Sequence, residues 1–252
     1  MSIEIDLQGR TAIVTGAAGG VGRATVAALR EAGASVVAED IDPGVRELEE
    51  DGVVAVVAVV GDVAATEVAD AAVRTAHERF GGLDVLVNNA ANFLLMGILD
   101  TTDEEWDRLM RSNVRGVFVH ARAALPSLLD SRGTMVNVAS VSGMVGTAGQ
   151  AAYCTTKGAV VQLTRQLAVE FGPRGVRVNA VGPGAIDTEF VARSLGLEPG
   201  DRPIPPAVLE SHPLGRVATP GEIAGVIAFL ASPLSGFMTG SIVMADGGAT
   251  AR

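Results

Sequence analysis

The strongest constraint on the fold is a repeated alternation between short apolar runs and longer segments with helical periodicity. Runs rich in Val, Ala and Ile predict strands at residues 11–16, 35–40, 53–62, 83–90, 133–140, 176–184 and 241–248. Predicted helices lie between them at residues 21–33, 66–81, 102–129, 151–172 and 220–232, the third of them bent near Gly116. Apolar strands that alternate with helices form a parallel sheet covered on both faces. The sequence therefore predicts an α/β fold with a doubly wound parallel sheet.

No linker interrupts this pattern, so residues 1–252 are predicted to form a single domain. Ligands of such sheets bind beyond the C-terminal ends of the strands, and the chemistry is expected there. The one irregular stretch, residues 188–215, contains Pro199, Pro203, Pro205, Pro206 and Pro213. Because long ordered loops often cover sites, we expect this stretch to be a substrate lid with short helical pieces.

Charge and composition exclude several classes of partner. The formal net charge of −10 disfavours binding to nucleic acid and to anionic membranes. No apolar run approaches the roughly 18 residues that a membrane span needs, and residues 1–10 lack the features of a secretory signal. The single cysteine, Cys154, cannot form an internal disulfide, and the three histidines show no metal-ligand spacing. We therefore expect a cytoplasmic protein without a metal site, whose histidines are core or surface residues.

A glycine-rich turn, TGAAGGVG at residues 15–22, joins the first predicted strand to the first predicted helix. Gly16, Gly20 and Gly22 allow the backbone to turn sharply and to approach a ligand closely. The helix that follows offers free N–H groups and the positive end of its dipole to phosphates. An ordinary glycine turn lacks this strand-before, helix-after context. The sequence thus predicts a Rossmann-type fold that binds a dinucleotide.

The second predicted strand ends at Asp40, 18 residues after Gly22. A carboxylate at this distance can accept hydrogen bonds from the adenosine ribose hydroxyls, and it repels a 2′-phosphate. Glu39 is the competing carboxylate, but strand alternation points it to the opposite face. The glycine turn contains no basic residue, and none follows Asp40 before Arg46. NAD is therefore the predicted cofactor, in preference to NADP.

Tyr153 is the only tyrosine of the chain, and Lys157 follows it by four residues in a helical pattern. Because positions i and i+4 share one helix face, the ammonium is predicted to stabilise the phenolate and to lower the pKa of Tyr153. Tyr153 could then exchange a proton with an alcohol or carbonyl oxygen. Ser140, at the end of the fifth predicted strand, could hold the same oxygen. Such a pair in isolation is more often a surface contact, but here it follows a dinucleotide site.

Together these motifs resemble the short-chain dehydrogenase/reductase family over essentially the whole chain. The resemblance rests on TGxxxGxG at 15–22, NNA at 88–90, Asn113 in RSNVRG, Ser140, YxxxK at 153–157 and PGxxxT at 183–188. It implies that Tyr153 is the catalytic acid/base and that Ser140 orients the substrate oxygen. It also implies that Lys157 holds the nicotinamide ribose and tunes Tyr153. Asn113 would interrupt its helix to hold a water that links Lys157 to solvent.

The resemblance further implies a set of residues that bind the cofactor. Asp62 and Val63 would flank the adenine. Asn89 and Ala90 would line the adenosine side. Ile186 and Thr188 would meet the carboxamide. The full implied set is Gly16, Gly20, Val21, Gly22, Asp40, Ile41, Asp62, Val63, Asn89, Ala90, Ala91, Tyr153, Lys157, Pro183, Gly184, Ile186 and Thr188.

Two positions in these motifs need separate comment, Ala91 because it departs from the family's pattern and Ser140 because a second serine lies nearby. The family's usual NNAG ends in Ala91 here, and an alanine in place of glycine would be strained if its φ were positive. We expect the alanine to be tolerated, because the catalytic positions are all filled. Ser142 is a second hydroxyl close to Ser140. Ser140 is preferred because it precedes Tyr153 by 13 residues, the usual spacing in the family.

The residues and the resemblance predict an NAD-dependent oxidoreductase that interconverts a secondary alcohol and a ketone. An NADPH-dependent 3-oxoacyl-thioester (acyl-carrier-protein) reductase is the alternative, and a non-catalytic dinucleotide-binding regulator is a further one. The apolar residues predicted near the nicotinamide favour a small or medium, uncharged substrate: Phe93, Leu94, Leu95, Met96, Met144, Val145, Phe190, Val191, Leu195, Leu197, Ile204, Val208 and Leu209. No nucleic-acid or membrane partner is expected, and the resemblance implies a homotetramer.

Overall fold

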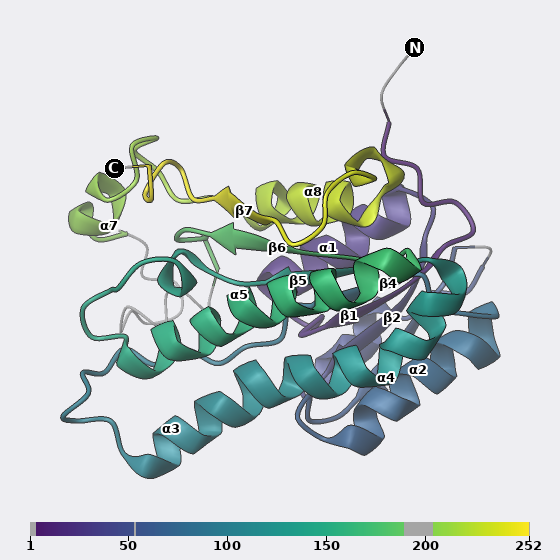
Figure 1. The fold of residues 1–252 in the computed structure, drawn as a ribbon, viewed down its shortest axis with the longest axis horizontal. Coiled ribbons are helices and arrows are strands. Elements are labelled where there is room, and N and C mark those ends of the chain that lie inside the picture. The colour runs from purple at the N-terminus through teal and green to yellow at the C-terminus, as the bar shows by residue number, and fades with distance from the viewer. Residues whose placement is uncertain (1–3, 53, 189–203, 252) are drawn as a thin grey trace.

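A seven-stranded parallel sheet forms the centre of the protein (Figure 1). The computed structural model describes residues 4–52, 54–188 and 204–251. The strands are β1 (Thr11–Thr15), β2 (Ser35–Asp40), β3 (Val56–Val60), β4 (Val85–Asn88), β5 (Thr134–Val138), β6 (Arg177–Pro183) and β7 (Ile242–Ala245). Their order is β3-β2-β1-β4-β5-β6-β7, and all neighbouring pairs run parallel. The predicted doubly wound α/β fold is confirmed.

Helices cover both faces of the sheet (Figure 1). On one face, α1 (Gly20–Glu31) packs against α8 (Pro220–Ala231). On the other lie α2 (Thr66–Phe80), α4 (Gly116–Ser131) and α5 (Ala151–Phe171). Each layer encloses its own apolar cluster, since strand side chains alternate between the two faces. Within the described residues, no helix is both long and apolar enough to cross a membrane.

Local signals fix where several helices begin and end. Helix α8 begins with a capping box, in which Thr219 and Glu222 satisfy each other's backbone N–H groups. The same arrangement of Thr102 and Glu105 starts α3 (Asp103–Leu109). Helix α2 ends at Gly81, whose φ of 86° is a left-handed conformation that glycine adopts without strain.

The predicted helix at 102–129 is in fact three segments. Between α3 and α4 lies a π-helical turn, η2 (Met110–Arg115), in which the N–H of Gly116 donates to the carbonyl of Arg111, five residues earlier. Apolar periodicity gives no sign of such a turn and indicated only a bend near Gly116. The family resemblance implied an interruption at Asn113, and Asn113 does lie in this turn. Single π-helical turns inside α-helices are rare and occur frequently at functional sites.

Five further short segments of the described chain shape the loops. The 3₁₀ helices η1 (Pro43–Leu48), η3 (Val141–Gly143), η4 (Gly172–Arg174) and η5 (Pro233–Ser235) follow β2, β5, α5 and α8. Helix α7 (Pro206–Glu210) lies beyond the C-terminal ends of the strands, near the C-terminus of the chain (Figure 1). The predicted lid falls largely on residues 189–203, which lie outside the described residues, so it stays a prediction.

Candidate active site

The glycine turn lies between β1 and α1 at the C-terminal edge of the sheet. Gly16 and Gly20 have φ values of +67° and +44°, which only glycine adopts freely. A Cβ on Gly22 would fall on the Gly16 carbonyl oxygen, and one on Gly20 would lie 3.0 Å from Thr188. The turn can therefore approach both its own helix and the loop after β6 only because these residues are glycines.

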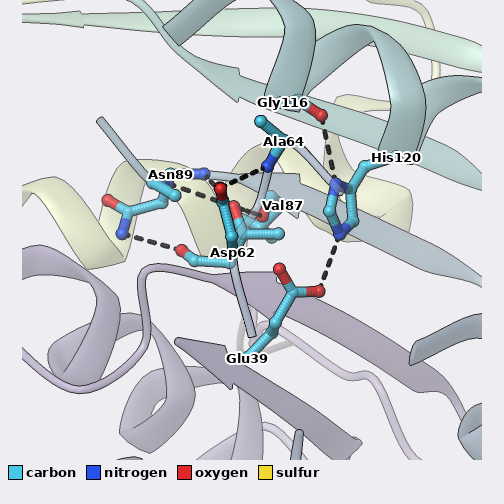
Figure 2. A network of polar contacts seen from close by, with 9 residues as sticks. Glu39, Asp62, Ala64, Val87, Asn89, Gly116 and His120 are labelled. Atoms are coloured by element: carbon cyan, nitrogen blue, oxygen red, sulfur yellow. Dashed lines mark hydrogen bonds and ion pairs between the residues drawn. The ribbon is translucent and has the colours of Figure 1, made fainter. Parts of the chain in front are cut away.

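Asn89 holds this turn in place from the neighbouring strand. Its side-chain amide donates to the carbonyls of Thr15 and Gly16 at 3.0 Å each. The Thr15 hydroxyl in turn accepts from the backbone N–H groups of Asn89 and Ala90. Asn89, predicted to line the adenosine side, thus fixes the shape of the cradle (Figure 2).

The two carboxylates at the end of β2 point to opposite faces, as strand alternation predicts. Asp40 lies at the glycine turn, where its oxygens accept from the N–H groups of Ala18 and Asp42, both at 2.9 Å. Glu39 is fully buried on the other face and pairs with His120 of α4 at 2.6 Å (Figure 2). The remaining oxygen of Glu39 has no hydrogen-bond partner among the described residues.

Asp62 and Val63 follow β3 on the same edge. The N–H of Ala64 and the guanidinium of Arg111 hold the pKa of the Asp62 carboxyl below its usual value, at donor distances of 2.9 and 2.7 Å. Figure 2 shows Asp62 turned toward Ala64. Val63 packs against Gly116, where an added Cβ would lie 3.0 Å from it.

Tyr153 and Ser140 meet at the start of α5 and the end of β5. Their hydroxyls are hydrogen-bonded, and the ring of Phe93 packs edge-on against Tyr153 with centroids 4.8 Å apart. Burial raises the pKa of Tyr153, and the bond to Ser140 acts against it. The predicted lowering is therefore wrong for the protein alone, since burial outweighs the hydrogen bond. Ser142 instead donates to Gln150 at 2.7 Å, which leaves Ser140 as the hydroxyl beside Tyr153.

Lys157 lies on the same helix face as Tyr153, as its spacing predicts. Its Nζ donates to the carbonyl of Val138 at 2.7 Å and lies 5.7 Å from the centre of the Tyr153 ring. The side chain is buried, and burial lowers the pKa of Lys157 to about 8. An ammonium with a lowered pKa, held beside a buried phenol, is an arrangement suited to proton transfer.

Asn113 occupies the π-helical turn and is almost fully buried. Its amide oxygen accepts from the N–H of Asn92 and from Ser112, and its amide nitrogen donates to the carbonyl of Asn92 and to Thr156. All four hydrogen-bonding positions of the side chain are thus taken by protein groups. Any water at this turn would have to bind its backbone.

One large cavity, of about 1480 Å³, runs along this edge from Asp40 to Tyr153. It brings together nearly all the predicted residues: Gly16, Gly20, Val21, Asp40, Ile41, Asp62, Val63, Asn89, Ala90, Ala91, Ser140, Tyr153, Lys157, Pro183, Gly184, Ile186 and Thr188. Gly22 and Asn113 are not among the residues that line it. Ala91 is unstrained, because Arg132 is the one non-glycine residue in the described chain with a positive φ.

Comparison with known proteins agrees with this geometry. The family model described as "Enoyl-(Acyl carrier protein) reductase" matches residues 16–250. A solved short-chain type dehydrogenase/reductase from Mycobacterium marinum is similar with a TM-score of 0.89 and 34% identity, over 98% of both chains. The chain belongs to the short-chain dehydrogenase/reductase family.

Two characterised short-chain dehydrogenase/reductase relatives differ in substrate. The 2-(S)-hydroxypropyl-CoM dehydrogenase 3 of Xanthobacter autotrophicus is 38% identical, over 97% of this chain and 98% of its own. The 3-oxoacyl-[acyl-carrier-protein] reductase of Vibrio cholerae is 35% identical, over 97% of this chain and 98% of its own. The protein is thus an oxidoreductase of a family that binds a nicotinamide dinucleotide.

The residues present fit a dinucleotide of this kind. The turn can take its tight shape against Asn89, Ala90 and Thr188 only because Gly16, Gly20 and Gly22 lack side chains, and a turn of this kind lets the backbone approach a pyrophosphate. The Asp40 carboxylate lines the far part of the cavity, and Ser140 and Tyr153 line the near part. These three features match three parts of a nicotinamide dinucleotide: Asp40 the adenosine ribose, the glycine turn the pyrophosphate, and Ser140 with Tyr153 the reactive ring.

Sequence reasoning missed several residues of this site. Arg23, in the first turn of α1, lines the cavity close to the Asp40 carboxylate and pairs with Glu47 at 3.3 Å. Its position directly after the last glycine could have drawn attention to it. Gln150 and His212 also line the cavity. Nothing in the residues around His212 indicates this, because only the fold brings it there.

Proposed function

We propose that this protein uses NAD(H) to interconvert a small or medium, uncharged secondary alcohol and the corresponding ketone. The observation that carries the proposal is the hydrogen-bonded pair of Tyr153 and Ser140 in the same cavity as the glycine turn. Two hydroxyls placed together can hold one oxygen, and one of them can exchange its proton. This reaction needs no further protein group at the reacting carbon.

Each residue has a distinct part in the proposed reaction. When bound, the nicotinamide ring supplies the hydride donor or acceptor. In ketone reduction, Ser140 and Tyr153 hold the carbonyl oxygen, and Tyr153 gives its proton to the oxygen as negative charge develops there. In alcohol oxidation the same proton moves the opposite way. Lys157 supplies positive charge beside the phenol.

The raised pKa of Tyr153 in the protein alone bears on direction. A buried, protonated phenol is ready to act as an acid, which suits ketone reduction at neutral pH. Alcohol oxidation needs the phenolate, and positive charge near the ring is required to stabilise it. The charge of Lys157 and that of an oxidised nicotinamide are the available sources.

The preference for NAD over NADP can be tested at Asp40. Its carboxylate would repel a 2′-phosphate, so Asp40→Asn is expected to shift the ratio of NADH to NADPH affinity toward NADPH by about tenfold, or about 1.4 kcal/mol. The asparagine keeps the shape and one acceptor oxygen, so it removes the charge and one of the two backbone hydrogen bonds, from Ala18 or from Asp42. Affinities are measured by NADH and NADPH fluorescence. An unchanged ratio would assign the preference to another group, such as the Arg23–Glu47 pair.

A second prediction concerns Lys157 and pH. If its ammonium holds the nicotinamide ribose, then cofactor binding favours the protonated lysine. NADH affinity is therefore expected to fall as the pH rises through about 8, the value to which burial lowers the pKa of Lys157. Lys157→Met should bind NADH more weakly, with no such pH dependence, and should lose turnover as well. A pH profile that the methionine variant retains would contradict this assignment.

The substrate class rests on the described apolar residues around Tyr153. Phe93 and Leu94 pack with the tyrosine, and Val145 and Val208 line the cavity. An ionised group without a partner would be costly in such surroundings. Several of the predicted apolar contacts, from Phe190 to Leu197, lie outside the described residues.

A substrate panel tests the proposal directly. Catalytic efficiency is compared for a neutral ketone, its carboxylate analogue and an acyl-thioester, each with NADH and NADPH. The neutral ketone with NADH is expected to be turned over best. A tenfold advantage of the carboxylate or the thioester, about 1.4 kcal/mol in transition-state binding, would overturn the substrate class.

The second candidate is a 3-oxoacyl-thioester reductase using NADPH. It is favoured by the similarity to the Vibrio cholerae acyl-carrier-protein reductase. Two features of this chain argue against it. The Asp40 carboxylate lines the cavity beside the glycine turn and would repel a 2′-phosphate bound there, and the net charge of −10 would slow the approach of an acidic carrier protein.

We also propose that the protein is a homotetramer and cytoplasmic. An apolar depression of about 520 Å³, formed by η2, Phe118 of α4 and one face of α5, supports self-association. Phe118, at its edge, is half exposed, and Phe237 on another surface is fully exposed. Side chains of this size on a monomer's surface favour burial against another chain. Sedimentation velocity is expected to show one species of four chains.

A further inference from the structure

His212 connects three segments that are far apart in the sequence. Its ring is buried, with 8% of its surface exposed. Nε2 accepts a hydrogen bond from the N–H of Ala185 at 3.0 Å, in the loop after β6. Nδ1 lies 2.7 Å from the carbonyl of Val208 in α7. A Cβ on Gly247, in the C-terminal segment, would lie 3.5 Å from the ring.

The partners of His212 determine its tautomer. A backbone N–H can only donate, so Nε2 must be unprotonated and must accept the hydrogen bond from the N–H of Ala185. The ring proton therefore resides on Nδ1 and is donated to the carbonyl of Val208. The neutral imidazole thus accepts on one side and donates on the other, and each bond can be removed separately by substitution.

The loop after β6, which is bonded to His212 at Ala185, continues to Ile186 and Thr188, the predicted contacts of the carboxamide. Backbone bonds hold it at two other points: the carbonyl of Ala185 accepts from Ala218, and the N–H of Asp187 donates to Ala218, at 2.9 and 2.8 Å. The His212 ring also fills the space beside Gly184, where a Cβ would lie 2.5 Å from Nε2. His212 therefore fixes both the course of the loop at Gly184 and the orientation of the Gly184–Ala185 peptide group, which precedes Ala185 and Ile186 in the loop.

We infer that His212 is a positioning residue for the nicotinamide end of the cofactor, acting through the Ala185 peptide. This inference rests on the proposed function, in which Ile186 and Thr188 meet the carboxamide. It also connects the loop to α7, because the same ring is bonded to Val208. Among the described residues, no hydrogen bond joins this ring to Asp40 or to the glycine turn at the adenosine end.

The experiment compares two ligands of known structure, NADH and ADP-ribose, by calorimetry. ADP-ribose contains the adenosine, the pyrophosphate and a ribose but no nicotinamide. Replacing His212 with Phe keeps a ring in the space and removes both hydrogen bonds. We expect its affinity for NADH to fall about tenfold, a typical loss for an N–H deprived of its acceptor. Its affinity for ADP-ribose should change less than twofold.

Two conservative variants identify the bond that matters. In His212→Gln the side-chain oxygen can take the place of Nε2 and receive Ala185, so NADH affinity should return to within about threefold of the wild type. In His212→Asn the amide can replace only Nδ1, and affinity should stay low. His77→Phe, far from the cavity on α2, is the matched control and should leave both affinities unchanged. Thermal unfolding of every variant confirms that it is folded.

The outcomes separate the inference from the function on which it rests. If wild-type protein binds NADH no more tightly than ADP-ribose, the nicotinamide has no site here, and the proposed function fails. If wild-type protein favours NADH and His212→Phe behaves like it, the positioning role is overturned. An equal loss of affinity for NADH and ADP-ribose would also overturn it, because His212 would then support the cavity as a whole. Rescue by His212→Asn and not by His212→Gln would overturn it too, because His212 would then act through α7.

Discussion

Tyr153→Phe is expected to lower turnover by about 10²–10⁴-fold, the usual contribution of a general acid or base. The phenylalanine keeps the ring that packs against Phe93 and removes only the hydroxyl bonded to Ser140. NADH affinity should stay close to that of the wild type, because the hydroxyl is assigned to the substrate and not to the cofactor. Turnover and NADH fluorescence titrations on the same preparation measure both quantities.

Two serines provide the matched control for this prediction. Ser140→Ala removes the hydroxyl beside Tyr153 and should also reduce turnover strongly. Ser142→Ala removes a hydroxyl two residues away that donates to Gln150, and its effect should be small. Wild-type turnover in Tyr153→Phe, or a larger effect at Ser142 than at Ser140, would contradict the assigned chemistry.

The second large effect is on stability, at the buried pair of Glu39 and His120 (Figure 2). Only 1% of each side chain is exposed, and one Glu39 oxygen already has no partner among the described residues. His120→Leu would leave the carboxylate buried and unpaired, which typically costs about 3–5 kcal/mol. Denaturant unfolding should show a loss of this size.

A double variant tests the physical reason for that loss. When both members of a buried ion pair are replaced by apolar residues, stability is often unchanged or improved. Glu39→Leu together with His120→Leu should therefore recover most of the free energy of unfolding lost in His120→Leu. His77→Leu, whose partner Ser127 carries no charge, is the control and should cost less. A double variant as unstable as the single one would show that packing, not the unpaired charge, causes the loss.

The same pair predicts how stability depends on pH. Burial acts to lower the pKa of His120, but the hydrogen bond and charge of Glu39 outweigh it and hold that pKa above the usual 6.5. A raised pKa means that folding favours the protonated histidine. Its contribution should be fully present below about pH 6.5 and should decline as the pH rises through the higher folded value. The double leucine variant should lack this component in its unfolding free energy.

Most of the fold could be predicted because a buried parallel sheet leaves a strong pattern. Near-continuous apolar runs located every strand, although the runs at 53–62 and 241–248 extend past β3 and β7 at both ends. Apolar residues Val54 and Ala55 precede β3, whereas Ser241 and Asp246 flank β7, so neither apolar nor polar composition fixes the end of a strand. Apolar periodicity alone did not show the π-helical turn, because one wide turn hardly alters the pattern over a long helix; only the family resemblance implied an interruption there, at Asn113.

The candidate site also has features that the sequence could predict and features that it could not. Tyr153, Lys157 and Ser140 could be placed together because helical spacing and a strand end are local features. The direction of the Tyr153 pKa shift could not, because it depends on burial by residues such as Phe93 from another part of the chain. The pair of Glu39 and His120, 81 residues apart, and the place of His212 arise only when the chain is folded.

The wide turn at Met110–Arg115 has a consequence for how this chain can change over evolutionary time. Losing one residue there would give a more regular helix, but it would rotate everything on one side by about 100° relative to the other. If α4 rotated, His120 would leave Glu39; if α3 and Asn113 rotated, the bonds to Asn92 would break. Each route disrupts a buried polar contact, so a single deletion should be selected against even where catalysis is not required. The turn would then persist in descendants that have lost the activity.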